Sequence, residues 1–381
     1  MSVLKPTTIA LLLLSGSALA HEGMPLPVDN RLHAWADLRL RDGNDGEFAV
    51  PGFMLNGGPA ANGLALAGSG IALQVAVPEQ GLSAWLEAGL HGDHVHGGGE
   101  GLELEQAWVA RHDGDWTLVA GRQFVTLGLR NASHGPAADF PEPSLAWRVF
   151  ADGNLRDDGV ALRHGGDGVV LGAGLWQGAF PAGGAGSDGR EAASLHLDGH
   201  ASLAGGRLLW RLSGLAARAA LREDARYADG HSHDPFTPAL PRTWFSGDSW
   251  LGTAGVQWTA DDGDLALLGE VFARREKGSV RSLTQLADYE GTQSGVHVEV
   301  LWSPVARWRL GLRQAALAAD NSLAGAGAAT LATLTGLQTA GNPLETTLLV
   351  ERRLDGNQLL RLQWTTTDQV VAGDSLLLQY A

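Results

Sequence analysis

The feature that most constrains this chain is a series of tight polar turns, each joining two stretches of about ten residues in which apolar and polar residues alternate. Alternation with a period of two predicts β-strands with one apolar and one polar face. Between consecutive turns the chain runs long, glycine-rich and irregular. Short connections at one end and long loops at the other are typical of a transmembrane antiparallel up-and-down β-barrel of the outer membrane. The turns are Asp113-Gly114-Asp115, Gly165-Gly166-Asp167-Gly168, Ala204-Gly205-Gly206, Asp261-Asp262-Gly263-Asp264, Ser303-Pro304-Val305, Asp355-Gly356-Asn357 and the looser Pro78-Glu79-Gln80-Gly81.

Residues 306–314 show the alternation most clearly. Apolar side chains on one face of a strand opposite three arginines suit a barrel with a wet lumen better than a soluble sheet. One face carries Trp308, Leu310 and Leu312, and the other carries Arg307, Arg309, Gly311 and Arg313. The same pattern recurs in residues 32–41, 195–200, 296–302 and 360–365. In residues 102–111 it assigns Leu102, Leu104, Trp108 and Ala110 to the lipid face and Glu103, Glu105 and Val109 to the lumen.

Counting these stretches predicts about 16 strands, all-β, with both chain ends on the periplasmic side. Seven turns join fourteen strands, and one strand precedes them at residues 31–41 and one follows at 374–380. Because the loosest turn is ambiguous, 14 or 18 strands remain alternatives. Sixteen strands would enclose an aqueous channel. The eight expected outward loops are residues 42–62, 91–100, about 124–156, 178–191, 221–248, 276–291, 318–342 and 367–373.

The N-terminus indicates export. Lys5, an apolar run and Ala18-Leu19-Ala20 form a secretory signal over residues 1–20, which leaves residues 21–381 as the barrel. That run is too short to span a bilayer, and residues 323–337 are too rich in small and hydroxylated side chains to do so. We therefore predict localisation in the cell outer membrane of a Gram-negative bacterium after signal-peptide cleavage.

Composition narrows the partners. With no cysteine, disulfides and thiolate zinc sites are excluded. The formal charge is −15, and loss of Lys5 with the signal would make it −16, which argues against nucleic acid. This acidity fits a vestibule that attracts cations, or simply solubility during export. The 13 tryptophans fit the aromatic girdles of a membrane barrel.

The third outward loop is the candidate constriction. In sixteen-stranded porins the loop between the fifth and sixth strands folds into the pore, and opposed acids and arginines there select ions. Proline residues at 136, 141 and 143 would stiffen it; an ordinary solvated surface loop is the alternative. The expected constriction residues are Arg130, His134, Asp139, Glu142 and Arg148, and the expected lumen-lining residues are Arg39, Glu103, Glu105, Arg307, Arg309 and Arg313.

Histidines in two other loops suggest metal contact. Each loop holds a His-x-His pair beside an aspartate, at Asp93 and Asp234, and imidazoles two residues apart in an extended loop can share Zn²⁺, Cu²⁺ or Ni²⁺. Two polar loops that happen to contain histidine are the alternative. The candidate ligands are His91, His94, His96, His231, His233 and Asp234.

An enzymatic function is not predicted. The sequence contains neither a Gly-x-Ser-x-Gly elbow nor a His-Glu-x-x-His pattern, and we assign no catalytic residue. A barrel hydrolase with a site at the lumen mouth is the third of three hypotheses, after a channel and a binding barrel with a plugged lumen.

From Gly101 onward the chain resembles a family of zinc-regulated outer-membrane porin-like proteins of Gram-negative bacteria. The resemblance covers about two thirds of the chain, and its third-loop segment is the most specific. The family's His-Pro-His and Trp-Asp-Phe are here His134-Gly135-Pro136-Ala137-Ala138-Asp139-Phe140, with one histidine and the tryptophan absent. The matching residues are Leu102-Glu103-Leu104-Glu105-Gln106-Ala107, Gly121-Arg122-Gln123-Phe124, Pro143-Ser144-Leu145-Ala146, Asn154-Leu155-Arg156-Asp157-Asp158-Gly159-Val160, Phe245-Ser246-Gly247-Asp248, Gly269-Glu270-Val271-Phe272-Ala273-Arg274-Arg275, Gln293-Ser294-Gly295 and Arg307-Trp308-Arg309-Leu310-Gly311-Leu312-Arg313.

Pattern and resemblance together predict a porin-like channel for passive diffusion of small solutes or ions, with a zinc-linked role implied by the resemblance alone. The alternative is an outer-membrane metal-capture or adhesin-like barrel whose lumen is plugged. No cofactor is expected to be required, beyond weak Zn²⁺ binding. Expected partners are outer-membrane lipid and lipopolysaccharide, small solutes or cations, and the barrel-assembly machinery, and a homotrimer is one expected assembly.

Overall fold

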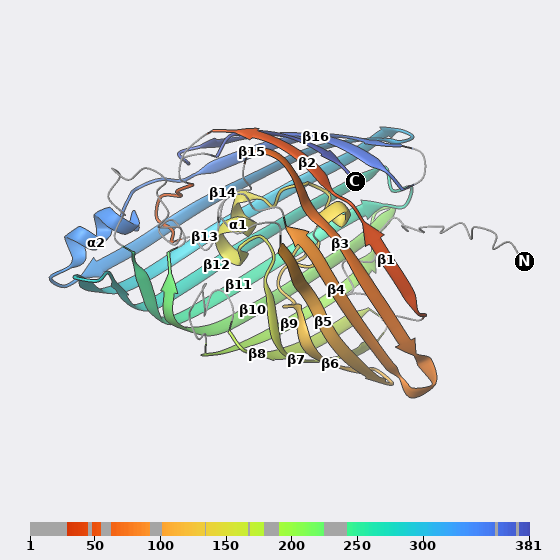
Figure 1. The fold of residues 1–381 in the computed structure, drawn as a ribbon, viewed down its shortest axis with the longest axis horizontal. Coiled ribbons are helices and arrows are strands. Elements are labelled where there is room, and N and C mark those ends of the chain that lie inside the picture. The colour runs from red at the N-terminus through yellow and green to blue at the C-terminus, as the bar shows by residue number, and fades with distance from the viewer. Residues whose placement is uncertain are drawn as a thin grey trace, which may run out of the picture.

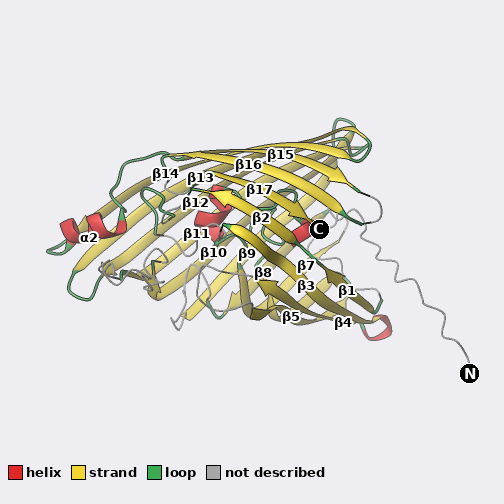
Figure 2. Cartoon of the chain, turned by 45° about the horizontal axis from the view of Figure 1, so that its top comes forward, coloured by secondary structure: helices red, strands yellow, loops and turns green. Residues whose placement is uncertain are grey.

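The computed structural model describes residues 29–44, 48–54, 62–91, 101–133, 135–166, 168–178, 190–224, 242–354, 357–370 and 373–381. Regular structure in these ranges is mostly antiparallel strand (Figures 1 and 2). The short helices are η1 (Pro78–Gln80), η2 (Gly135–Ala137), α1 (Leu145–Ala151) and α2 (Ala328–Thr335). None of the helices described here is long and apolar enough to cross a membrane. The strands are β1 (Arg31–Trp35), β2 (Leu38–Gly43), β3 (Gly63–Val77), β4 (Leu82–His91), β5 (Gly101–Asp113), β6 (Trp116–Phe124), β7 (Arg156–Gly166), β8 (Val169–Trp176), β9 (Arg190–Ser202), β10 (Gly206–Glu223), β11 (Trp244–Ala260), β12 (Leu265–Arg281), β13 (Leu286–Val305), β14 (Trp308–Ala324), β15 (Leu344–Arg353), β16 (Leu359–Asp368) and β17 (Ser375–Tyr380).

The strands form a closed ring. From β3 to β17 each strand pairs with the next in sequence, and β17 returns to pair with β2, from Ser375↔Gly43 to Tyr380↔Leu38. Both β1 and β2 pair with β3, so they are two halves of one interrupted strand. Counted as one, they make the 17 described strands a barrel of sixteen, as predicted.

A β-bulge causes the interruption. Trp35 pairs with Gly70 and Leu38 with Leu66, so β3 advances four residues (66 to 70) while the first strand advances three (35 to 38). Gly68 lies at this point with φ 75°, a left-handed conformation that glycine adopts at low cost. The N–H of Asp37 turns to the Ser69 hydroxyl at 2.8 Å. The bulge therefore keeps the backbone bonded and changes the phase of β3, whose outward residues are Leu64 and Leu66 before it and Ile71 and Leu73 after it.

Burial alternates along the strands as the sequence predicts. On β13, His297 and Glu299 are buried inside the barrel, whereas Val298 is 46% exposed and Trp302 51% exposed on the outside. Strands β1, β2, β9, β14 and β16 follow the predicted faces too. Every inward charge is thus placed away from lipid.

The prediction for residues 102–111 was half wrong. Val109 is 60% exposed on the outer face, while Trp108 and Ala110 are buried inside. The cause is a register shift between Glu87 and Ala88 of β4, which adds one residue to β5 at Glu105. A one-residue slip exchanges the two faces of the remaining strand, and the alternation pattern alone does not reveal a bulge.

The predicted turns fall between consecutive strands, although one is displaced, and Asp167, Asp355 and Gly356 of two of them lie outside the described residues. β13 continues through Pro304 to Val305, with a register shift after Trp302, and the chain reverses at residues 306–307. Arg307 adopts φ 71° in this turn. Proline is tolerated at such an irregular strand end because its missing N–H is not needed by the ladder.

Three outward loops are shorter than predicted, because β10 to β14 have 17 to 20 residues each. The expected loop at residues 276–291 is reduced to residues 282–285, and α2 occupies part of the expected loop at 318–342. About 9–11 residues suffice to cross a bilayer, so these strands stand well beyond it. The outward side chains of the projecting part include the exposed polar residues Arg275, Lys277, Asp288 and Glu290, with Leu286 exposed on the same face.

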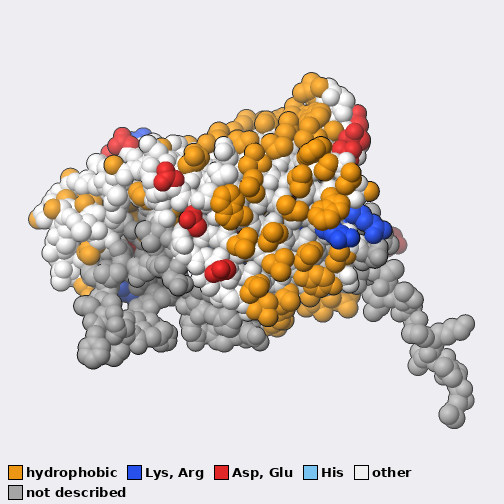
Figure 3. All heavy atoms as spheres, turned by 90° about the horizontal axis from the view of Figure 1, so that it is seen from above, with side chains coloured by type: hydrophobic (Ala, Val, Ile, Leu, Met, Phe, Trp, Pro, Cys, Tyr) orange, Lys and Arg blue, Asp and Glu red, His pale blue; other side chains and the backbone are white. Residues whose placement is uncertain are grey.

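An apolar belt encircles the turn half of the barrel. Figure 3 shows one face of the barrel, on which hydrophobic side chains cover the right part and scattered carboxylates lie further to the left. Exposed tryptophans lie within the belt as interface residues do in membrane barrels. They include Trp116, Trp302, Trp308 and Trp364.

This belt gives a stability prediction. We expect Val298→Arg, in the belt, to lower the free energy of unfolding by about 2–4 kcal/mol, since a cation on the lipid face near the bilayer middle is poorly solvated. Ser294→Arg is the matched control, because Ser294 is exposed on the same face of β13 in the polar projecting part. Urea unfolding in lipid vesicles measures both. Equal losses for the two variants would contradict the placement of the belt.

Candidate functional site

The third loop, residues 125–155, folds into the barrel instead of over its rim. Its helix α1 lies inside the ring of strands (Figure 1). Leu145, Trp147 and Phe150 are almost completely buried, and both aromatic rings pack on Phe272 of β12 at 5.2 and 5.3 Å between centroids. The Ser144 hydroxyl accepts from the Trp147 N–H and begins the helix. The predicted inward fold of this loop is therefore what the structure has.

Two lumen carboxylates hold the loop through its backbone. Glu270 of β12 accepts from the Leu129 N–H at 2.5 Å and from the Trp147 indole N–H at 2.9 Å. Glu345 of β15 accepts from the Leu145 N–H at 2.9 Å and also pairs with Arg148. Hydrogen bonds to a charged acceptor are among the stronger ones in a protein interior. The wall thereby fixes the loop at Leu129 and at the first half of α1.

Asn131 joins the two ends of the loop. Its amide N–H₂ donates to the carbonyls of Val125 at 2.6 Å and Leu155 at 2.8 Å, and its side-chain oxygen accepts from the Leu155 N–H at 2.6 Å. Because the loop leaves β6 and enters β7 at these residues, Asn131 closes it into a compact unit.

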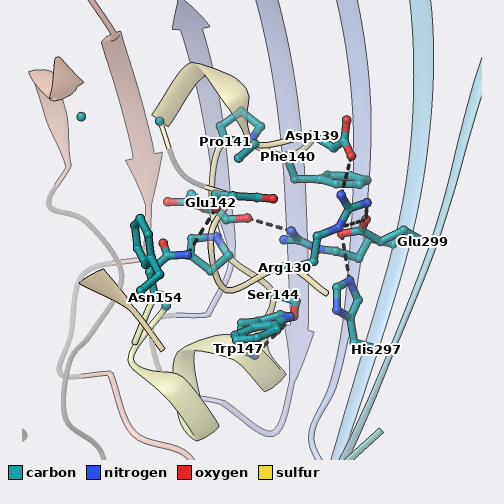
Figure 4. A pocket seen from close by; sticks show the side chains of 18 of the residues that line it. Arg130, Asp139, Phe140, Pro141, Glu142, Ser144, Trp147, Asn154, His297 and Glu299 are labelled. Carbon is teal, nitrogen blue, oxygen red and sulfur yellow. Dashed lines mark hydrogen bonds and ion pairs between the residues drawn. The ribbon is translucent and has the colours of Figure 1, made fainter. Parts of the chain in front are cut away.

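A chain of alternating charges crosses from the loop to the wall. Arg130 pairs with Glu299 of β13 at 2.5 Å and with Asp139 at 2.8 Å. Asp139 also pairs with Arg309 of β14 at 2.6 Å, and Arg309 reaches Glu351 of β15 at 3.0 Å. Figure 4 shows Arg130 between Asp139 and Glu299, with His297 below. Each described charge in this chain has an opposite neighbour, so the network is a rigid element and not a loose lining.

Glu142 binds the opposite side of the loop to the wall. Its carboxylate pairs with Arg41 of β2 at 2.9 Å, and its backbone carbonyl accepts from Arg313 of β14 at 2.7 Å. Both carboxylates predicted for the constriction, Asp139 and Glu142, therefore lie in buried ion pairs, and Arg148 is paired as well.

A cavity of about 250 Å³ remains between the loop and the wall (Figure 4). Arginines and carboxylates both line it, so it presents a field across its width instead of a single sign of charge. Its charged lining residues are Arg39, Glu105, Arg130, Asp139, Glu142, Arg156, Glu299 and Arg313, with His297 beside them.

The charges in the loop stabilise each other. Burial alone would raise the pKa of Asp139, but the guanidinium groups of Arg130 and Arg309 hold it below its usual range. Burial likewise opposes the cation of Arg130, yet Glu299 and Asp139 keep its pKa above the usual value. Both groups are thus charged throughout the physiological pH range.

The first outward loop also enters the lumen. Within residues 48–54, Val50 and Phe53 are buried, and Phe53 meets Phe150 of α1 edge to face at 6.0 Å. The Gly52 carbonyl accepts from Gln293 at 3.1 Å and Asn321 at 2.8 Å. This segment therefore covers α1 from the loop end and narrows the space around it.

Most predicted lumen residues lie where expected. Arg39 pairs with Asp37 at 2.7 Å, Glu105 pairs with Arg156, and Glu103 is exposed opposite Gly89 on the same inner face. Arg307 was wrong as a lumen residue, because it lies exposed in the β13–β14 turn. His134 lies outside the described residues.

The candidate metal ligands are not brought together within the part of the chain that the structure describes. His94, His96, His231, His233 and Asp234 lie outside that part, as does the side chain of His91. Among described residues, no group of three or more His, Asp and Glu side chains has metal-binding geometry. The metal site stays a prediction.

Sequence reasoning missed Glu270, Glu345 and Asn131 as site residues. Glu270 and Glu345 occupy positions of the alternating pattern that face the lumen. A search for lumen-facing carboxylates on the strands around the third loop could therefore have found them. No local signal marks Asn131, whose partners are 6 and 24 residues away.

Comparison with solved structures gives the fold. The channel DcaP of Acinetobacter baumannii aligns with a TM-score of 0.58 at 12% identity, covering 94% of this chain and 98% of that one. OmpF of Salmonella typhi gives 0.56 at 10% identity, covering 92% and 97%. The trimer form of OmpT of Vibrio cholerae gives 0.54 at 11%, covering 92% and 98%. The chain thus has the fold of outer-membrane porins and channels. No family model and no curated protein sequence matches it, and the structural relatives carry no indication of zinc.

The paired carboxylates generate a selectivity prediction. Replacing Asp139 with Asn and Glu142 with Gln removes two negative charges beside the cavity, so the reversal potential in a salt gradient should shift toward anions. Because both acids are buried in ion pairs, we now expect weaker seating of the loop as well, contrary to the small folding effect that a solvated loop would give. Glu290→Gln is the control, since Glu290 is half-exposed outside the barrel. No shift relative to that control would exclude the loop from the conduction path.

The lowered pKa of Asp139 makes the free energy of unfolding depend on pH. A carboxyl with a depressed folded-state pKa contributes stability above its unfolded value of about 3.9 and loses it as pH falls through the folded value. Asp139→Asn should cost about 1–3 kcal/mol near neutral pH, because Arg130 and Arg309 each keep a second carboxylate. The difference from wild type should stay constant between pH 7 and 5 and close below about pH 4. Tryptophan fluorescence during urea unfolding measures it; closure near pH 6 would point to another group.

Proposed function

We propose that this chain is an outer-membrane channel through which small hydrophilic solutes or ions diffuse passively, past a constriction made by the third loop. The observation that carries the proposal is the loop itself, inserted in a sixteen-stranded barrel and held by Arg130, Asp139 and Glu142 beside a charged cavity. A barrel this wide has room for water at its centre. A charged constriction then sorts what passes.

Several features support a passive channel over an enzyme. Many of the inward carboxylates near the cavity, including Glu142, Glu299 and Glu351, are paired with arginine, which leaves them poorly suited to acid–base work. The solved relatives are named as porins and channels. We assign the short turns to the periplasm and the projecting strands to the outside, where lipopolysaccharide would surround the belt. Assembly by the barrel-assembly machinery and a homotrimer belong to the same proposal.

The second candidate is a binding barrel with a closed lumen. Residues 48–54 and the third loop together fill much of the loop half, with Phe53 and Phe150 in direct contact. Such a barrel would present its loops to a ligand without conducting. The zinc-linked role belongs to either candidate, rests on the resemblance alone, and would involve the histidine loops.

Planar-bilayer recordings with the full mature chain separate the two candidates. Unitary current steps in KCl are the expected result, and a protein that inserts as a folded barrel without steps would favour the closed alternative.

Calorimetry with Zn²⁺ tests the proposed metal binding by the histidine loops. Binding should be weak, fall below about pH 6.5 as imidazole protonates, and vanish when His94, His96, His231 and His233 are changed to Ala. Equal binding by that variant would remove the histidine loops from the zinc proposal.

A further inference from the structure

One stretch of the lumen wall is aromatic. On β1, β4 and β5 the inward side chains in the turn half include His33, Trp35, Trp85 and Trp108, which we call the aromatic wall. Trp85 and Trp108 are direct cross-strand partners, and the His33 and Trp85 rings lie 5.5 Å apart. These tryptophans face away from lipid, so they are not part of the interface girdle.

The aromatic wall begins at the rim of the charged cavity. The Trp35 indole N–H donates to the Gly68 carbonyl at 2.5 Å, and a Cβ placed on Gly135 would lie 3.8 Å from the same nitrogen. Gly68 and Gly135 both line the cavity. A solute that leaves the constriction toward the turn end therefore meets Trp35 and then Trp85.

The tryptophan rings are held in place by hydrogen bonds from their indole N–H groups. Trp85 donates its indole N–H to Glu87 at 2.9 Å, Gln106 donates to the same carboxylate at 2.7 Å, and Trp108 donates to Gln106 at 3.4 Å. Because each N–H is already bonded to the wall, Trp35 and Trp85, both only partly buried, have ring surface to offer a solute. Rings fixed in advance lose little conformational entropy when something stacks on them.

We propose that the aromatic wall is a stacking site for a neutral, hydroxylated ring, which in chemical terms is a small saccharide. The site rests on the proposed channel function and names its solute class. A pyranose has a flat face of C–H groups that suits an indole and a rim of hydroxyls that suits nearby amides, hydroxyls and carboxylates. Here Gln74 is the partly exposed amide on the inward face of β3, whereas Ser83, Glu87 and Gln106 on the neighbouring strands are buried and hold the wall itself. Sites that combine aromatic surface with a few placed polar groups are typical of small-molecule recognition.

The test uses the full chain in planar bilayers, with maltose and the acyclic polyol sorbitol as probes. Maltose should lower the KCl current in a saturable way, whereas sorbitol should act only through viscosity. Trp35→Leu and Trp85→Leu keep apolar volume but remove the flat face, and each should raise the half-blocking maltose concentration about fivefold. Trp85→Tyr should restore most of the block. Trp364→Leu, on the outer face of β16, is the matched control and should behave as wild type.

A measurement that needs no current separates this inference from the channel proposal. Saturation-transfer NMR on the detergent-solubilised protein should show transfer to maltose ring protons in wild type and in Trp364→Leu, and reduced transfer in Trp85→Leu. If this holds while bilayers carry no current, the channel proposal fails and the saccharide site stands. Equal effects of maltose and sorbitol with no saturation transfer, or transfer to phenol but not to maltose, would overturn the saccharide assignment.

Discussion

Everything in this structure depends on one requirement, that no backbone N–H or C=O is left unpaired where only hydrocarbon surrounds it. The pairing of β17 with β2 meets it where the sheet returns on itself, and among the described strands β1 keeps a partner on one side, β3. Closure has a second consequence, because a strand in a closed barrel must show one face to lipid and the other to the lumen. Charged residues such as Glu299 and Arg313 can then be placed on the same strands that carry Val298 and Leu312 outward.

The same requirement for paired backbone groups explains how the third loop is held. A loop inside a barrel brings its own unpaired backbone groups into a partly dry space, where leaving them unsatisfied would cost free energy. Glu270 accepts from the Leu129 N–H near the start of the inserted segment, Glu345 accepts from the Leu145 N–H where α1 begins, and Arg211 donates to the Gly128 carbonyl at 2.8 Å. The charged lumen is therefore as much a scaffold for the loop as a lining for a pore.

The sequence was sufficient for the architecture because both of its signals are local. Turn residues and two-residue alternation need no partner, so sixteen strands and their lipid-facing side chains could be predicted. The inserted third loop was predicted from its place in the strand count, by analogy with sixteen-stranded porins. Events that depend on a neighbouring strand could not: the bulge at Glu105, which inverts Trp108 and Val109, and the continuation of β13 through Pro304. Asp139 and Glu142 were expected at a constriction opposite arginines of the lumen wall, and Asp139 does pair with Arg309; the pairing of Glu142 with Arg41 required the three-dimensional structure.

The five long strands β10 to β14 give the barrel a rim of unequal height. On their inner side, Phe245, Val280 and Tyr289 form an apolar cluster with Leu331 of α2, so the projecting sheet has a small core of its own. On their outer side the projecting part carries exposed polar side chains beside an apolar one, Leu286. Residues such as Arg275 and Glu290 can therefore change without affecting barrel closure or the constriction. The outer face of the projecting strands is thus the part of the surface whose amino-acid sequence is most free to change.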